Sequence, residues 1–194
     1  MSRQPLAAGL ASPVTGPEDF QRTIWRLGRE LQERHPGGEL VTLCGIVTRG
    51  VHLAERLQRT IADQGGGSWT AVALDVGPYR DDQPRSPGAR GRIPLLPPAY
   101  QSSIQDRVVV LVDDVLYHGR TARSALVALS ALGRPASVEL LVMVDRGHRE
   151  LPLRATYVGR NLPTSTDQRV YVHVLDCDLE DAIRVGGAQE ACDR

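Results

Sequence analysis

The stretch VVVLVDDVLYHGRTARSAL, residues 108–126, decides the fold expected for this chain. Its first five residues are apolar and mostly β-branched, which predicts a strand buried on both faces of a parallel sheet. From Thr121 the apolar residues recur at three- and four-residue steps, which predicts a helix that ends at Gly133 and Pro135. A strand followed by a turn and a helix is the repeating unit of an α/β fold with a doubly wound, mostly parallel sheet.

The turn between this strand and helix has two features of a ligand site. Residues His118 to Thr121 precede the helix, where unpaired backbone N–H groups and the helix dipole favour an anion. Asp113 and Asp114 come at the carboxyl end of the strand, the edge at which open α/β sheets bind ligands. A phosphate cradle beside two carboxylates predicts a ligand with phosphate and hydroxyl groups, accompanied by a divalent cation. The alternative, a surface turn with solvated acids, is disfavoured because carboxylates at the end of a buried strand cost stability.

The remaining sequence continues the alternation of strands and helices. Helical spacing predicts helices at 18–34 and 51–61, and apolar runs predict strands at 40–47, 70–76, 138–144 and 170–175. Residues 81–98 are rich in Pro, Gly and Arg without any period, which is typical of a functional or disordered loop. We expect a disordered leader at 1–17, one α/β domain at 18–180 and a C-terminal tail at 181–194.

Composition narrows the possible functions. The 194 residues carry 23 basic and 23 acidic side chains, so a nucleic-acid surface would have to be a local patch. The sequence has no membrane span and no signal-peptide core, and its three cysteines lack metal or disulfide spacing, which predicts a cytoplasmic protein. The chain contains no lysine, which excludes a P-loop and any Schiff-base or lysine-nucleophile chemistry.

The opening stretch resembles the phosphoribosyl-pyrophosphate (PRPP) binding motif of type I phosphoribosyltransferases. Three further segments extend the likeness: GIVTRGVHLAERL, LDVGPYRDD and VDRGHRELPLRATYVGRNLPTS. Singly, the first contains an ordinary turn and the last reads as a charged surface connection. Together with VDDVLYHGRT they closely resemble the bifunctional pyrimidine operon regulator and uracil phosphoribosyltransferase family, PyrR, over about residues 18–176. The last segment is distinctive of that family, which argues against a transferase for a purine or for orotate.

This resemblance implies a function and a set of partners. The fold would be of the type I phosphoribosyltransferase kind with a mobile flap loop, and the enzyme a pentosyltransferase of the glycosyltransferase class that serves pyrimidine salvage. Uracil N1 would attack PRPP to give UMP and pyrophosphate without a covalent enzyme intermediate, with Mg²⁺ held mainly through PRPP. A homo-oligomer, a dimer or larger, and UMP-dependent binding to the leader mRNA of a pyrimidine operon are also implied. An RNA-binding transcription attenuator with little catalytic turnover is the alternative.

Carried over position by position, the resemblance also implies roles for residues. The catalytic residues would be Asp113, Asp114, Arg80 and Asp81, of which the last two lie on the flap. PRPP would be bound by Thr48, Arg49 and Gly50 at the pyrophosphate, by Asp113 and Asp114 at the ribose, by Val115, Leu116 and Tyr117, and by His118, Gly119, Arg120 and Thr121 at the 5′-phosphate. Val144, Asp145 and Arg146 would neighbour the base, and RNA would contact Arg22, Arg26, Arg29, His148, Arg154 and Arg160.

Several positions depart from the family pattern. His118 stands where the family loop has threonine, so an imidazole replaces a phosphate-binding hydroxyl, although a protonated ring still meets phosphate. Pro78 and the preceding Gly77 stand where members more often carry Thr-Leu, which changes the hinge of the flap. On the first helix, Trp25 replaces a threonine and Arg29 a histidine. Arginine can grip phosphate or stack on a base, whereas a helical tryptophan is more typical of packing or a subunit contact.

Overall fold

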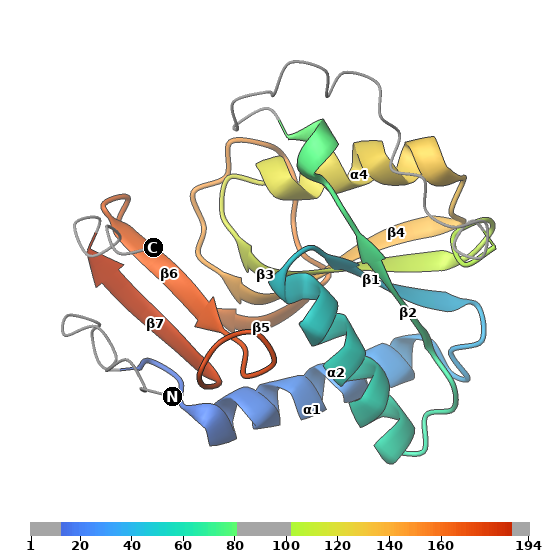
Figure 1. Cartoon of the computed structure of the whole chain (residues 1–194), viewed down its shortest axis with the longest axis horizontal. Coiled ribbons are helices and arrows are strands. Elements are labelled where there is room, and N and C mark those ends of the chain that lie inside the picture. Colours follow the sequence, from blue (N-terminus) through green and yellow to red (C-terminus); the bar gives the residue numbers. More distant parts are fainter. Residues whose placement is uncertain (1–12, 81–101, 188–194) are drawn as a thin grey trace, which may run out of the picture.

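A five-stranded parallel sheet with the strand order β2-β1-β3-β4-β5 forms the centre of the protein (Figure 1). The computed structural model describes residues 13–80 and 102–187. The strands are β1 (Val41–Ile46), β2 (Thr70–Leu74), β3 (Val108–Leu116), β4 (Ser137–Asp145) and β5 (Tyr157–Asn161). The expected doubly wound, parallel α/β fold is confirmed.

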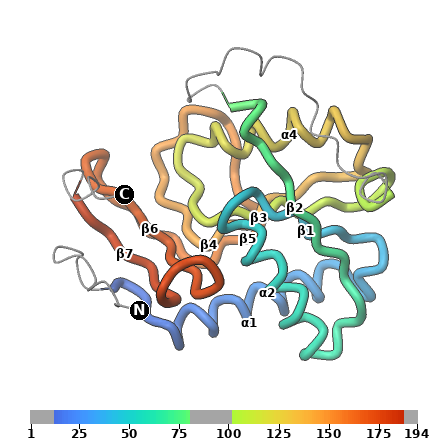
Figure 2. Tube along the Cα trace, in the orientation of Figure 1, coloured from blue at the N-terminus to red at the C-terminus, as the bar shows by residue number. Residues whose placement is uncertain are grey.

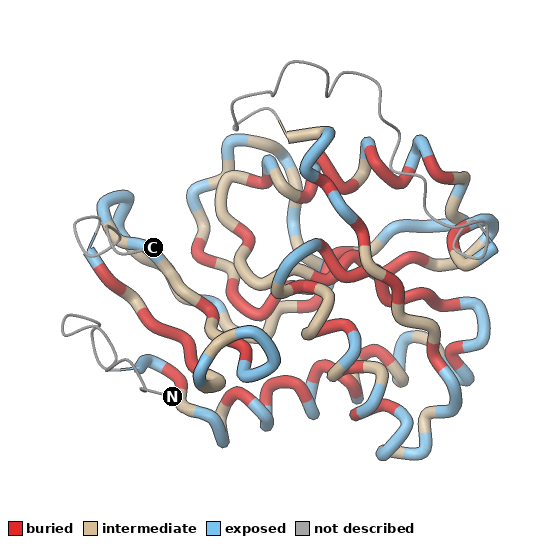
Figure 3. Tube along the Cα trace, in the orientation of Figure 1, coloured by how far each residue is buried: buried red, intermediate tan, exposed pale blue. Residues whose placement is uncertain are grey.

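Helices cover both faces of this sheet. Helices α1 (Pro17–Arg34) and α2 (Arg49–Asp63) pack on one face, and α4 (Arg120–Leu132) packs on the other (Figure 1). Because successive strand residues point to opposite faces, β3 contributes Val110 to the core under α1 and α2 and Leu111 to the core under α4. The inner strands β1, β3 and β4 are therefore buried along most of their length, as Figure 3 shows.

The strand order places a ligand-binding edge next to β1. From β1 the chain goes to β2 on one side and then crosses back past β1 to β3 on the other side, so the sheet reverses its direction of winding between β1 and β3. Gly45 of β1 pairs with Val112 of β3, which brings the carboxyl ends of the two strands together. Open α/β sheets bind ligands outside the strand ends at such a reversal. The turns after β1 and β3 both lie there.

Two strands differ from the sequence expectation. β3 runs through both aspartates to Leu116 rather than ending at Val112, because β4 lies alongside and pairs Val115 with Val144. β5 falls within the segment that also reads as a charged surface connection, and it pairs in parallel with β4. Both differences come from a neighbouring strand that supplies backbone partners to residues whose side chains are polar.

A two-stranded antiparallel sheet of β6 (Gln168–His173) and β7 (Ala182–Gly187) stands beside the main sheet (Figure 2). β7 corrects the expected division of the chain, which ended the domain at residue 180 and placed a tail at 181–194. Ile183 is buried and forms a bridge with Thr15, so parts of both expected end segments belong to the folded unit. Residues 1–12 and 188–194 lie outside the described residues. None of the described helices is long and apolar enough to cross a membrane.

Candidate active site

Asp113 and Asp114 lie side by side in β3, next to the end of β1. Burial, followed by repulsion from Asp114, raises the pKa of Asp113 well above its ordinary value, and the charge of Arg80 partly offsets this rise. The Val115 backbone N–H donates to Asp114 Oδ1 at 2.7 Å. Two carboxylates held this close repel each other, so the pair favours a ligand that brings hydroxyl donors or positive charge.

The turn after β3 ends in a glycine that opens α4. Gly119 is the residue before the helix and has a φ of 91°, a left-handed conformation that favours glycine. The first turn of α4 then begins at Arg120, and its backbone N–H groups have no carbonyl partner within the helix. The turn therefore has the donors and the dipole that an anion requires.

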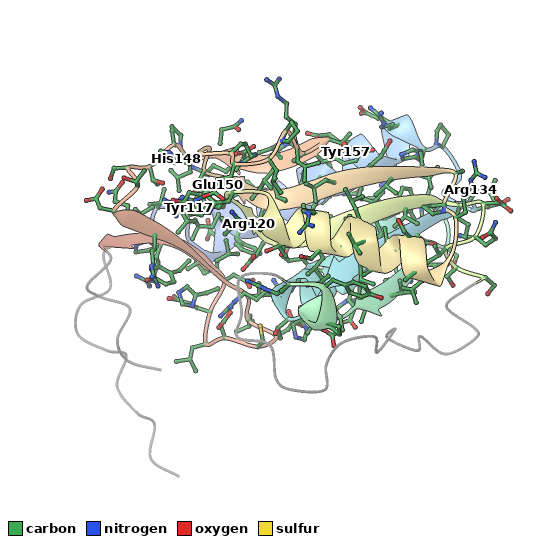
Figure 4. All side chains as sticks on the ribbon, turned by 90° about the horizontal axis from the view of Figure 1, so that it is seen from above. Tyr117, Arg120, Arg134, His148, Glu150 and Tyr157 are labelled. Carbon is green, nitrogen blue, oxygen red and sulfur yellow. The ribbon has the colours of Figure 1, made fainter. Side chains whose placement is uncertain are left out.

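Glu150 places a carboxylate beside the arginine and the histidine of this turn. Arg120 donates to Glu150 Oε2 from Nε at 2.8 Å and from Nη2 at 2.6 Å, and Glu150 Oε1 lies 3.3 Å from His118 Nδ1. Figure 4 shows Tyr117, Arg120, His148 and Glu150 together at one end of α4, the end opposite to Arg134. Sequence reasoning missed Glu150, because nothing local to the RGHRELP segment indicates that it returns to the β3–α4 turn.

Arg146 ties the end of β4 to the loop after β5. Its guanidinium carbon lies 3.8 Å from the centroid of the Tyr117 ring. The Arg146 side chain donates to Thr164 Oγ1 at 3.0 Å and to the carbonyl oxygens of Ser165 at 3.1 Å and Gln168 at 2.8 Å. The side chain of Arg146, which was expected to neighbour the base, is therefore bound to other parts of the chain.

The other two expected base neighbours are also engaged within the chain. The Val144 side chain is fully buried in the core. Asp145 forms an ion pair with Arg149 and accepts the Gly147 backbone N–H at 2.9 Å. These three residues lie at the carboxyl end of β4, beside the end of β3. The Val144 side chain packs in the core, and those of Asp145 and Arg146 bind the neighbouring loops.

The turn after β1 approaches β3 very closely. A Cβ atom on Gly50 would lie 2.3 Å from the carbonyl oxygen of Val112, so only glycine fits there. This approach brings Arg49 near the paired acids: its hydrogen bonds to Asp178 raise the pKa of the guanidinium, and the charge of Asp114 adds to that effect. Thr48 is the residue before α2 and, like Arg49, lies at the strand edge.

Only the start of the expected flap is described. A short 3-10 helix, η1 (Gly77–Tyr79), precedes Arg80, and Ser124 of α4 donates to the Tyr79 carbonyl oxygen at 3.1 Å. Arg80 is close enough to lower the pKa of Asp113, as stated above. Asp81 and residues 82–98 of the expected flap lie outside the described residues.

Arg22, Arg26 and Arg29 lie on the exposed side of α1. Arg26 donates from Nη2 to the carbonyl oxygens of Val158 at 3.1 Å and Gly159 at 2.6 Å on β5, and it pairs with Glu30. Arg29 lies over the exposed Trp25 ring. Arg26 therefore holds α1 against the edge of the sheet, whereas Arg29 faces solvent.

The remaining expected RNA contacts lie elsewhere. His148 is exposed near the β3–α4 turn, and Arg160 is half-buried in β5. Arg154 is exposed and lines a small cavity together with Ala122 and Leu126 of α4, on the face opposite to α1. Within one chain, the six positions thus fall on both sides of the sheet and do not form a single patch.

A divalent cation has a partial ligand set here. In the described parts of the chain, no three His, Cys, Asp or Glu side chains gather into a group that could hold a metal. Mg²⁺ is usually bound by one or two carboxylates together with the phosphates of a substrate. The adjacent carboxylates of Asp113 and Asp114 fit that kind of site.

Comparison with known proteins identifies the class to which this fold and site belong. The family described as "Phosphoribosyl transferase domain" matches residues 20–175, so the chain belongs to that family. The hypoxanthine phosphoribosyltransferase of Trypanosoma cruzi has a TM-score of 0.68 at 18% identity, over 92% of this chain and 97% of that one. That of Staphylococcus aureus has a TM-score of 0.65 at 20% identity, over 92% of each chain. At these identities the likeness concerns the fold.

Closer relatives narrow the family. "Bifunctional protein PyrR" of Herpetosiphon aurantiacus is 47% identical over 161 residues, which are 83% of this chain and 88% of the relative. The protein of the same name from Streptomyces coelicolor is 45% identical over 184 residues, 93% of this chain and 92% of the relative. The chain is therefore a member of the PyrR family of phosphoribosyltransferases. The family and the enzyme class expected from the sequence are confirmed.

Proposed function

We propose that this protein transfers the phosphoribosyl group of PRPP to N1 of uracil and releases UMP and pyrophosphate. The observation that carries the proposal is the meeting of two anion-binding turns and a pair of carboxylates at one edge of the sheet. Membership in the PyrR family and the resemblance of the segment at 144–165 support uracil as the base. A homo-oligomer located in the cytoplasm is part of the same proposal.

The paired acids would act on the ribose. Asp113 and Asp114 would accept hydrogen bonds from the 2′- and 3′-hydroxyl groups, which relieves the repulsion between the two carboxylates. As the bond to pyrophosphate breaks, positive charge develops on the ribose ring beside them. Fixed carboxylates near developing positive charge stabilise the transition state without having to reorganise.

The two turns would hold the two ends of PRPP. The backbone N–H groups at the start of α4, with His118 and Arg120, would bind the 5′-phosphate. Arg49 would place its charge on the departing pyrophosphate, since a guanidinium matches the geometry of phosphate oxygens. Mg²⁺, when bound through PRPP and these carboxylates, supplies further positive charge to the leaving group. Most of the rate acceleration would therefore come from positioning and from electrostatics.

The test is a base-specificity assay on the purified protein with PRPP and Mg²⁺. We expect UMP to form with uracil, and no nucleotide to form with hypoxanthine or orotate at the same concentration. Hypoxanthine is the informative control because the two proteins of similar fold named above are hypoxanthine phosphoribosyltransferases. A faster reaction with hypoxanthine than with uracil would overturn the proposal.

A second function that we propose is UMP-dependent binding of the leader RNA of a pyrimidine operon. The word "Bifunctional" in the relatives' name supports a second activity. Arg29 beside the exposed Trp25 offers a cation and a ring to RNA, and Arg154 offers another exposed cation. Because these groups lie on different sides of one chain, the proposed RNA surface combines residues of two subunits.

RNA binding can be tested separately from catalysis. Arg29→Glu and Arg154→Glu should each weaken binding of the organism's own pyrimidine leader, measured by filter binding with UMP, and should reduce its salt dependence by about one released ion each. Arg134→Glu, at the far end of α4, is the matched control (Figure 4). Arg26 is unsuitable because it holds β5. If the protein binds this leader no more tightly than a scrambled RNA, the second function is refuted and only the enzymatic one remains. If it binds the leader RNA but does not turn over uracil, the result favours the transcription attenuator.

A further inference from the structure

The connection between β6 and β7, residues 174–181, lies against the start of α2 and is held there by charge. Arg56 of α2 donates to Asp176 Oδ2 at 2.5 Å and to Asp181 Oδ2 at 2.7 Å. Two turns earlier in the helix, Arg49 donates from Nε to Asp178 Oδ2 at 3.0 Å and from Nη2 to Asp178 Oδ1 at 2.9 Å. We call residues 174–181 the acidic connection. Of the ion pairs between this connection and α2, the pair of Asp178 with Arg49 lies at the turn after β1, which is part of the candidate active site.

Two hydrogen bonds with the backbone of Val174 hold Asp178 in place. The Val174 N–H donates to Asp178 Oδ2 at 2.8 Å, and the Asp178 N–H donates to the Val174 carbonyl oxygen at 2.7 Å. The Asp178 side chain is only 15% exposed, compared with 40% for Arg49. Burial raises the pKa of Asp178, but the hydrogen bonds from Arg49 and from the Val174 N–H outweigh it and lower the pKa below its ordinary value. The carboxylate is therefore ionised at neutral pH and rigidly held.

A bidentate pair fixes the plane of a guanidinium group as well as its position. Arg49 is held in this way by Asp178, and the charge of Asp114 also acts on it. The side chain of a partly exposed arginine is otherwise free to take many rotamers. Asp178 thus restricts Arg49 at the point where the turn after β1 meets the paired acids.

We propose that Asp178 is a positioning residue for Arg49, which it holds in the orientation that receives the pyrophosphate of PRPP. This inference rests on the proposed function, since it takes Arg49 as a pyrophosphate ligand. A carboxylate beside an arginine has two opposite effects on an anion: it orders the guanidinium, and it also reduces the local positive charge. If order dominates, removal of the carboxylate weakens pyrophosphate binding, and if charge dominates, removal strengthens it.

Asp178→Asn separates these two effects. The variant keeps the shape of the side chain but loses the charge and one of the two acceptor oxygens. Asp176→Asn is the matched control, because it removes the same charge from the same connection but contacts Arg56 instead of Arg49. Calorimetric titration with PRPP and Mg²⁺, and with pyrophosphate and Mg²⁺, gives the two affinities. Turnover assays give the KM values for PRPP and uracil.

We expect Asp178→Asn to weaken both affinities by about tenfold, the loss of one charge-assisted hydrogen bond. The KM for PRPP should rise while the KM for uracil stays unchanged. Asp176→Asn should stay within about twofold of the parent, because Asp176 pairs with Arg56, two turns further along α2 than Arg49. A merely structural role would move both variants together. Arg49→Lys should be no further impaired by Asp178→Asn, because the two changes remove the same interaction.

Equal or tighter PRPP binding by Asp178→Asn relative to Asp176→Asn would overturn the inference. If Asp178→Asn does not fold, Asp178→Glu against Asp176→Glu carries the same test, since the added methylene moves the carboxylate without removing it. A parent protein that binds PRPP but does not use uracil would refute the proposed base while leaving this comparison of affinities valid. A parent protein that does not bind PRPP would refute both.

Discussion

The two strand-to-helix turns of the site hold their arginines in different ways. In the turn after β1, Arg49 binds a carboxylate that is 15% exposed and comes from the acidic connection. In the turn after β3, Arg120 binds Glu150, whose side chain is 43% exposed. Exposed ion pairs contribute only about 0–1 kcal/mol, whereas a shielded bidentate pair is held more firmly. An incoming phosphate can therefore displace Glu150, while Arg49 keeps its partner.

The glycines of the two turns differ as well. Gly50 is needed because another backbone passes where its Cβ would be, and Gly119 is needed because its φ is 91°. The first turn is thus built into the packing of α2 on β3, and the second depends mainly on its own backbone conformation. The first turn resembles a fixed part of the core and the second an adaptable loop.

The largest effect is expected at the acids that both turns face. Asp113→Asn together with Asp114→Asn should lower PRPP turnover by about 100-fold or more, since the reacting group loses its alignment. Burial and the charge of Asp114 raise the pKa of Asp113, so its ionised form costs stability at neutral pH and the cost disappears as the pH falls. The melting temperature at pH 7 should therefore not fall in the double variant.

Turnover and thermal melting of the same preparations check this prediction. Asp63→Asn, at the exposed end of α2, is the control for loss of a carboxylate away from the site. Unchanged turnover with an unchanged melting temperature would remove Asp113 and Asp114 from the site.

The next effect compares the two glycines. Gly50→Ala should destabilise the fold by about 3 kcal/mol, because the new Cβ would overlap the Val112 carbonyl oxygen and force the backbone to move. Gly119→Ala should cost about 1 kcal/mol, the strain of a left-handed residue, and Gly119→Asn should cost less. Urea unfolding measures both free energies. A larger cost at Gly119 than at Gly50 would reverse the distinction between a packed turn and an adaptable one.

A smaller effect is expected from the carboxylate on the second turn. Glu150→Gln removes the negative charge that competes with phosphate for Arg120 and His118, so UMP and PRPP should bind a few-fold tighter, in line with about 0–1 kcal/mol for an exposed pair. The gain should shrink at high salt because screening weakens the competing pair. Titration calorimetry at two salt concentrations measures it, with Glu33→Gln on α1 as the control. Weaker binding would show that Glu150 supports the turn instead.

The smallest effect is expected on the melting temperature at acidic pH. Arg49 and the Val174 N–H lower the pKa of Asp178 despite its burial, and Arg56 and Arg59 do the same for Asp176. A carboxylate with a lowered pKa in the folded state contributes stability that is complete above its unfolded pKa, about 3.9, and is lost as the pH falls through the folded value. The melting temperature should therefore drop below about pH 4, and less steeply in Asp178→Asn. An equally steep drop in that variant would contradict this assignment.

The buried strands and amphipathic helices were predictable because their signals are local. Apolar runs at 108–112 and 138–144 predict β3 and β4 without reference to any other part of the chain. β5 and β7 were missed because each is short and contains glycine and arginine, and each forms where a neighbouring strand supplies its backbone partners. The same neighbour effect carries β3 through Asp113 and Asp114, which no strand propensity favours.

The sequence by itself determined the two strand-to-helix turns, the paired acids and the resemblance to a family, because these depend on residues within a few positions of one another. Only the tertiary structure decided which charges meet across the chain. Asp178 reaches Arg49 across 129 positions, and Glu150 reaches Arg120 across 30. Arg26, which reads as a surface cation, instead binds the carbonyl groups of β5. Such pairs follow from strand order and register, which many distant apolar contacts set together and no local pattern encodes.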